Sequence, residues 1–129
     1  VQSGGYVGGA SGIEISTDIG GLDTLLGGEG LFFLKAAGTG PLFLGSYGGL
    51  VERDVADGES YTVDSGHLVA WEESMHYETR RVGGLKETIL SGEGLVFTFD
   101  GPGSLWLQTR DYDAFLAEII SHLPSQQTD

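Results

Sequence analysis

Residues 28–34 read Gly-Glu-Gly-Leu-Phe-Phe-Leu, and residues 92–96 repeat the pattern as Gly-Glu-Gly-Leu-Val. Outward from this pair, further matches keep the same order along the chain. They are Gly-Gly-Leu at 20–22 and 83–85, Phe33 and Phe97, and Gly-x-Gly followed by two alternating leucines at 38–44 and 101–107. Self-similarity in a fixed order marks a duplicated structural unit. The sequence therefore predicts approximate repeats at 1–47 and 48–110.

Glycine-rich turns separate many short apolar runs in this chain. The sequence has 129 residues, of which 23 are glycine, well above the usual share of about 7%. Tight turns between short strands are typical of an all-β sandwich or barrel, which one domain of this length can form. The expected strands are 6–8, 13–17, 31–37, 42–46, 50–55, 61–63, 68–71, 75–82, 95–99 and 105–109.

Alternation within these segments predicts which side chains face the core. In the segment 75–82, Met75, Tyr77 and Thr79 share one face, while polar residues occupy the other. Both repeats carry leucine at matching positions after the Gly-x-Gly turn. The leucines expected in the core are Leu42, Leu44, Leu105 and Leu107.

The end of the chain changes from a strand period to a helical one. Apolar residues between Phe115 and Leu123 form a single stripe at helical spacing, and Pro124 follows it. We expect an amphipathic helix at 111–123 and a frayed tail at 124–129. The stripe must be covered, either by a sheet face or by another subunit.

The charge balance excludes several classes of partner. The chain has 19 acidic and 6 basic residues, for a net charge of −13. Such a surface repels phosphate backbones and anionic bilayers, so we expect no nucleic acid and no membrane insertion. Absence of cysteine excludes disulfides and thiolate sites. We expect a cytoplasmic protein, and the acidity is typical of a salt-adapted cytosol or of a merely acidic protein.

Four charged residues are candidates for a ligand site. Glu29 and Glu93 lie in the two Gly-Glu-Gly turns, where a pseudosymmetric pair of carboxylates would suit a ligand or a cation. Arg80 and Arg81 could hold a carboxylate through paired hydrogen bonds. The plainer interpretation is a solvated glutamate in a glycine turn and arginines paired with nearby acids, and the sequence favours it.

Two histidines are the candidates for a metal site. His67 and His76 lie near Glu72 and Glu73, which is the residue chemistry of a cupin-like metal enzyme. The nine-residue spacing and the lack of a His-x-His pair favour exposed strand-end histidines instead. We expect neither a bound metal nor a cofactor.

Aromatic side chains could stack a ligand or pack in the core. The four that the sequence singles out are Trp71, Trp106, Tyr47 and Phe43, and core packing is the more frequent role. No serine lies in a Gly-x-Ser-x-Gly elbow and no phosphate-binding loop is present. The set of catalytic motifs that the sequence lacks therefore predicts a protein that is not an enzyme.

Several of these motifs together resemble one family. They are Gly-Glu-Gly-Leu-Phe-Phe-Leu at 28–34, Asp-Ser-Gly-His-Leu-Val-Ala-Trp at 64–71, Arg-Arg-Val-Gly-Gly-Leu-Lys at 80–86, Gly-Glu-Gly-Leu-Val at 92–96 and Gly-Pro-Gly-Ser-Leu-Trp-Leu-Gln-Thr-Arg at 101–110. Over about residues 1–110 the chain is similar to the altered-inheritance-of-mitochondria family, long catalogued as a domain of unknown function.

The resemblance implies a fold like that of the tryptophan RNA-binding attenuation protein. That fold is built from antiparallel β-sandwich units in a double-stranded β-helix style, and members of the family usually carry three repeats. The chain would then hold the last repeat and most of the preceding one, with the upstream repeat missing. Homo-oligomers are expected of the family, and it supplies no agreed catalytic residues.

Taken together, the sequence predicts a non-enzymatic, oligomeric scaffold or interaction protein. We expect self-association, with a trimer among the expected states, and an unpaired sheet edge where an upstream repeat would join. The alternative is a small-ligand or cation-binding module at a repeat or subunit interface. A cupin-like metal enzyme is the third hypothesis.

Overall fold

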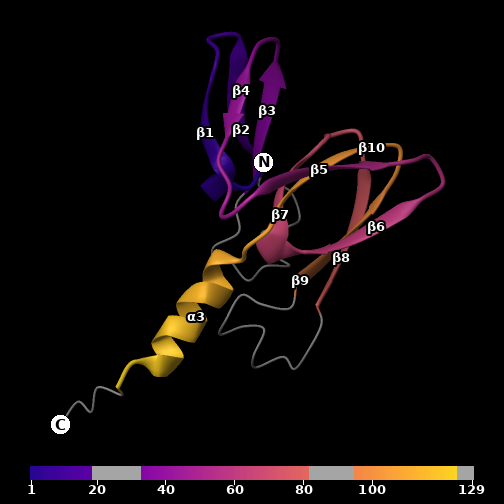
Figure 1. The fold of residues 1–129 in the computed structure, drawn as a ribbon. Helices are drawn as coiled ribbons and strands as arrows, with labels where there is room; N and C mark the ends of the chain where they lie inside the picture. The colour runs from indigo at the N-terminus through magenta and orange to yellow at the C-terminus, as the bar shows by residue number, and fades with distance from the viewer. Residues whose placement is uncertain (19–32, 82–94, 125–129) are drawn as a thin grey trace.

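The computed structural model describes residues 1–18, 33–81 and 95–124, and within them the chain is antiparallel β with one C-terminal helix (Figure 1). This architecture confirms the predicted fold class. The two Gly-Glu-Gly turns, the two Gly-Gly-Leu motifs and the tail after Pro124 lie outside the described residues. No helix among the described residues is long and apolar enough to cross a membrane.

All ten predicted strands are present, and their ends differ from the prediction by at most two residues. A helix, α3, replaces the strand pattern at Tyr112–His122, and two short 3-10 turns, η1 and η2, occupy Ser3–Gly5 and Ser65–His67. The strands are β1 (Tyr6–Gly9), β2 (Ile13–Asp18), β3 (Phe33–Gly38), β4 (Leu42–Leu44), β5 (Leu50–Val55), β6 (Ser60–Asp64), β7 (Leu68–Trp71), β8 (His76–Arg81), β9 (Leu95–Asp100) and β10 (Gly103–Gln108).

The strands form four antiparallel sheets among the described residues. The first half contributes two pairs, β1-β4 and β2-β3, and the second half contributes two triplets, β5-β10-β7 and β6-β9-β8. In Figure 1 the first four strands stand together as one lobe, and the remaining six curve around a second. Among the described residues, no strand takes the place of β5 beside β4, and only Val1 and Gln2 pair with β3 where β6 pairs with β9.

The two halves share one pairing register. In the first half Leu42 lies opposite Gly9 and Leu44 opposite Tyr6, with a bulge between these pairs. In the second half β10 and β7 pair in the same way, again with a bulge, with Leu105 opposite Trp71 and Leu107 opposite Leu68. The matching leucines thus occupy corresponding ladder positions.

One match read from the sequence shifts by a residue in the structure. The sequence aligns Phe33 with Phe97, and it aligns Val1-Gln-Ser-Gly at 1–4 with Val63-Asp-Ser-Gly at 63–66. In the structure Phe97 lies opposite Val63, whereas the residue bonded to Val1 is Leu34. Val1 and Leu34 exchange two backbone hydrogen bonds, at 2.6 and 2.8 Å. Phe33 instead lies beside Phe97 in space, with ring centroids 5.7 Å apart.

The buried core belongs mainly to the second half. Phe97, Phe99, Leu68 and Leu105 are fully buried, and Phe33 is the first-half residue that joins them. Alternation in β9 explains this, because every second side chain from Leu95 onward points inward.

The expectation that Leu42 and Leu44 are core residues was wrong. Both are only half-buried, whereas Leu105 is fully buried and Leu107 packs against the core. The physical reason is the number of described neighbours, because β10 is flanked by described strands on both sides and β4 on one.

Close approach of neighbouring backbone explains why glycine occupies the Gly-x-Gly turns. A Cβ atom at Gly38 would collide with the Gly12 carbonyl, and one at Gly101 would collide with the Ala56 carbonyl. Gly38 also has φ of +131°, which disfavours other residues. The repeated motif is thus explained by turn geometry and needs no ligand.

The burial difference between the halves predicts unequal mutational costs. Leu105→Ala should lower the free energy of unfolding by about 2–5 kcal/mol, because it empties a fully buried site. Leu42→Ala should cost less than about half as much, since its side chain is already half in solvent. Urea denaturation measures both, and equal losses for the two variants would contradict this account.

Candidate functional site

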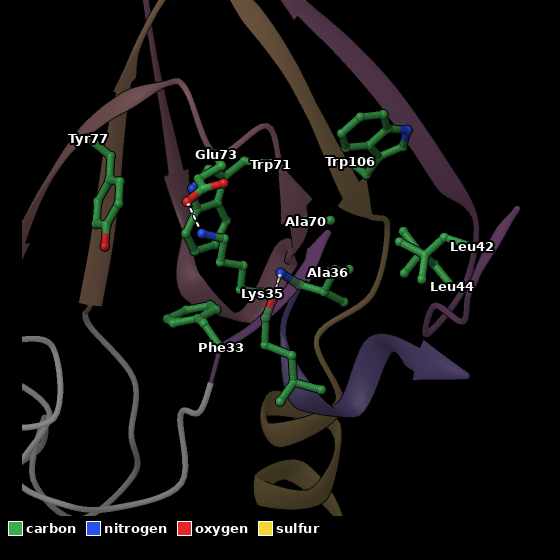
Figure 2. A pocket seen from close by; sticks show the side chains of 12 residues that line it. Phe33, Lys35, Ala36, Leu42, Leu44, Ala70, Trp71, Glu73, Tyr77 and Trp106 are labelled. Atoms are coloured by element: carbon green, nitrogen blue, oxygen red, sulfur yellow. Dashed lines mark hydrogen bonds and ion pairs between the residues drawn. The ribbon is translucent and has the colours of Figure 1, made fainter. Parts of the chain in front are cut away.

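A cavity lies where the first-half strands meet the second half. Its volume is about 390 Å³, within the range of small-ligand sites. Figure 2 shows side chains from both halves converging on it. The lining residues are Val1, Phe33, Leu34, Lys35, Ala36, Leu42, Leu44, Ala70, Trp71, Glu73, Tyr77 and Trp106.

Aromatic rings form one wall of the cavity. Trp71, at the end of β7, meets Phe33 edge-on with centroids 4.8 Å apart, and it meets Tyr77 edge-on at 5.3 Å. Such edge-to-face contacts hold the rings in fixed orientations. The wall is therefore built by strands from both halves, β3 from the first and β7 and β8 from the second.

The opposite end of the cavity is aliphatic. Leu42 and Leu44 from β4 line it together with Trp106 from β10 (Figure 2). The half-buried leucines that were expected in the core therefore form a cavity surface. Trp71 and Trp106 are the two tryptophans of the chain, so both report on this space.

One ion pair marks the polar end of the cavity. The Lys35 ammonium lies 2.7 Å from a Glu73 carboxylate oxygen, and their side chains are 43% and 72% exposed. Water screens a pair this exposed, so it contributes little to stability. The pair places one positive and one negative side chain at this end of the cavity.

The amino group of Val1 adds a third polar group. Its nitrogen donates to the Leu34 carbonyl at 2.8 Å. Burial lowers the pKa of this amine, because the charged form loses hydration.

The candidate residues that carry charge lie elsewhere or outside the described residues. Glu29 and Glu93 are in the segments that the structure does not describe. Arg80 and Arg81 lie exposed near the end of β8, opposite Val96 and Leu95. Neither arginine lines the cavity.

The two histidines have separate surroundings. His67 lies in η2, where its Nδ1 is 2.9 Å from the Gln108 carbonyl oxygen. His76 is exposed on β8, with Nε2 4.0 Å from a Glu78 oxygen. Among the described residues, no three His, Asp or Glu side chains gather as metal ligands do.

Two of the four aromatic candidates line the cavity. Trp71 and Trp106 do so, whereas Phe43 is 60% exposed on β4. Tyr47 packs on the helix, with its ring 5.4 Å from that of Tyr112.

Sequence reasoning missed Lys35 and Tyr77 as cavity residues and weighed Glu73 only for a metal. For Lys35 and Tyr77 the sequence contained a signal. Lys35 is one of the few bases in an acidic chain, and Tyr77 shares a face with the buried Met75. What the sequence lacked was the packing of β3 and β8 on either side of Trp71, which brings these residues to one cavity.

The fold places the chain in the class of antiparallel all-β proteins, and comparison with known proteins gives the family. The chain belongs to the mitochondrial biogenesis AIM24 family, whose model matches residues 1–110. This confirms the resemblance seen in the sequence motifs.

Two streptococcal proteins are similar to this chain. An uncharacterized protein of Streptococcus pyogenes serotype M6 is 32% identical over 102 residues, which are 78% of this chain and 41% of that protein. The crystal structure of a Streptococcus pyogenes protein from a structural genomics programme superposes with a TM-score of 0.77 at 24% identity, over 95% of this chain and 54% of that one. The chain thus spans about half the length of these relatives or less.

Proposed function

We propose that the chain is a non-enzymatic binding module whose cavity holds a small, largely apolar ligand. The observation that carries this proposal is a cavity of about 390 Å³ with an aromatic wall. Among its described side chains, only Lys35 and Glu73 are charged. Of the functions considered from the sequence, this geometry favours the ligand-binding alternative over the scaffold.

The chemistry of the lining supports binding rather than catalysis. The described lining residues include no serine, histidine or cysteine that could act as a nucleophile or a metal ligand. Rings, leucines and alanines instead offer apolar surface, whose burial favours an apolar ligand by about 25 cal/mol per Å². A polar group on such a ligand would meet Lys35 or Glu73.

A neutral ligand fits the electrostatics best. The chain carries a net charge of −13, which repels anions over the whole surface. The Lys35–Glu73 pair is itself neutral overall. N-phenyl-1-naphthylamine, a neutral aromatic dye that fluoresces in apolar surroundings, is therefore a suitable probe.

Filling the cavity should abolish dye binding. Ala36 lines the cavity on β3, so Ala36→Phe places a ring inside it. We expect the affinity for the dye to fall by at least about tenfold, which corresponds to about 1.4 kcal/mol. A fluorescence titration measures this, and quenching of Trp71 and Trp106 by the bound dye gives a second readout.

The neighbouring alanine provides the matched control. Ala37 is exposed on β3 and does not line the cavity. Ala37→Phe should bind the dye as the parent does, because the side chain at position 37 is outside the cavity lining. Equal binding by the parent and both variants would show that the dye binds elsewhere and would contradict the proposal.

The second candidate function is an oligomeric scaffold or interaction module in the cytoplasm, built from a duplicated unit. The specific observation is the edge of β4. Leu105 and Leu107 of β10 pair with Arg53 and Val51 of β5, but no described strand pairs with that side of β4. Open strand edges can accept a further strand from another chain. Sedimentation velocity tests this candidate, because a monomer at all concentrations would contradict it.

A further inference from the structure

The two ends of the cavity differ in chemistry, and this difference indicates the class of ligand that the cavity would hold. The Lys35–Glu73 ion pair lies at one end, and these are the only charged side chains among the described lining residues. Leu42, Leu44 and Trp106 line the other end (Figure 2). A ligand that fills the cavity therefore meets polar groups at one end and apolar surface at the other.

Two alanines line the stretch between these ends. Figure 2 shows Ala36 and Ala70 between the ion pair and the leucines of β4, and Ala70 is 3% exposed on β7. Their short side chains leave the middle of the cavity open. At about 30 Å³ for each water-sized group, the volume of about 390 Å³ accommodates roughly thirteen heavy atoms. An extended chain of that size can contact both ends at once, whereas a compact ring system fills one end.

Hydration of the ion pair selects the head group of the ligand. The Lys35 and Glu73 side chains are 43% and 72% exposed, so water surrounds the pair. A ligand group that displaces this water keeps its favourable contacts only if it both donates and accepts hydrogen bonds. A hydroxyl does both, because its O–H can donate to the Glu73 carboxylate and its oxygen can accept from the Lys35 ammonium.

A charged head group fits this end less well. Each charge would be attracted by one member of the Lys35–Glu73 pair and repelled by the other, and it would lose hydration on entering the cavity. The net charge of −13 also repels anions, and its attraction for cations is screened beyond about 8 Å at physiological salt.

We propose that the ligand is a single-chain amphiphile with an uncharged, hydroxyl-type head. The head lies at the Lys35–Glu73 pair, and the aliphatic chain runs past the two alanines to the leucines of β4. Carbons next to the head pack on the rings of Trp71 and Tyr77, which line the same end. This inference rests on the proposed binding function and deepens it by naming the class of ligand.

Displacement of N-phenyl-1-naphthylamine by straight-chain primary alcohols tests the shape of the ligand. The affinity should rise about fourfold for each added methylene and stop rising near thirteen heavy atoms, where the cavity is full. The compact 1-adamantanol, which has as many heavy atoms as 1-decanol, should bind at least about tenfold more weakly. Binding of 1-adamantanol as tight as that of 1-decanol would overturn the extended shape.

Two isomeric ligands test the position of the head. Both 1-decanol and 1-methoxynonane accept a hydrogen bond, but only the alcohol donates one, so the parent should bind the alcohol at least about tenfold more tightly. Replacing the pair through Lys35→Met together with Glu73→Met should reduce this ratio below about threefold. Glu78→Met is the matched control, because Glu78 is exposed on β8 outside the cavity lining, and it should keep the parent ratio. Circular dichroism checks that the variants keep the fold.

The outcomes separate this inference from the binding function on which it rests. An unchanged ratio in the double variant would overturn the placement of the head, and tighter binding of decanoate or decylammonium than of 1-decanol would overturn its lack of charge. If the parent binds the dye and the alcohols do not displace it, the ligand class is wrong and the binding function stands. A parent that does not bind the dye would overturn both.

Discussion

The packing of Phe33 into the second-half core is the contact on which the rest of the structure depends. Phe33 is 5% exposed, and its ring meets Trp71 and Phe97 at 4.8 and 5.7 Å. It is the only first-half side chain in the buried core cluster of the described residues. Burial of an aromatic ring contributes roughly 3 kcal/mol, a large part of what holds two small lobes together.

The cavity follows from this contact. Once Phe33 fixes β3 beside Trp71, the next residues of β3 lie along the space between the lobes, and Lys35 reaches Glu73. Leu42 and Leu44 line the far end, where β4 has one described neighbour strand and its leucines stay half-buried. Among the described strands, the side of β4 that corresponds to the β5 side of β10 has no partner, which leaves that edge open.

Most of the strand pattern could be predicted from the sequence, because glycine turns and alternation act locally. The segments of β5 and β7 agree with the prediction at both ends, and Leu105 lies in the core as expected. Leu42 does not lie in the core, because its burial depends on a neighbouring strand, and a local sequence pattern cannot reveal that strand. The Phe33 match failed for a related reason, since the register is set by pairing with Val1 and Gln2.

The candidate site was less predictable. Trp71 and Trp106 could be selected from the sequence by residue type. That they line one cavity with Lys35 depends on packing between residues more than thirty positions apart in sequence. Glu29 and Glu93 are site candidates because their turns are repeated in the sequence. The Gly-x-Gly turns are repeated as well, and close backbone contacts explain their glycines without a ligand. Residue type indicates what a site could contain, and long-range packing decides which residues form it.

Hydrogen exchange on Phe33→Leu tests the central claim most directly. If Phe33 joins the lobes, the amides of β1 to β4 should exchange about tenfold faster, while those of β9 and β10 keep their protection. Uniform acceleration in both lobes, or no change in either, would contradict the account.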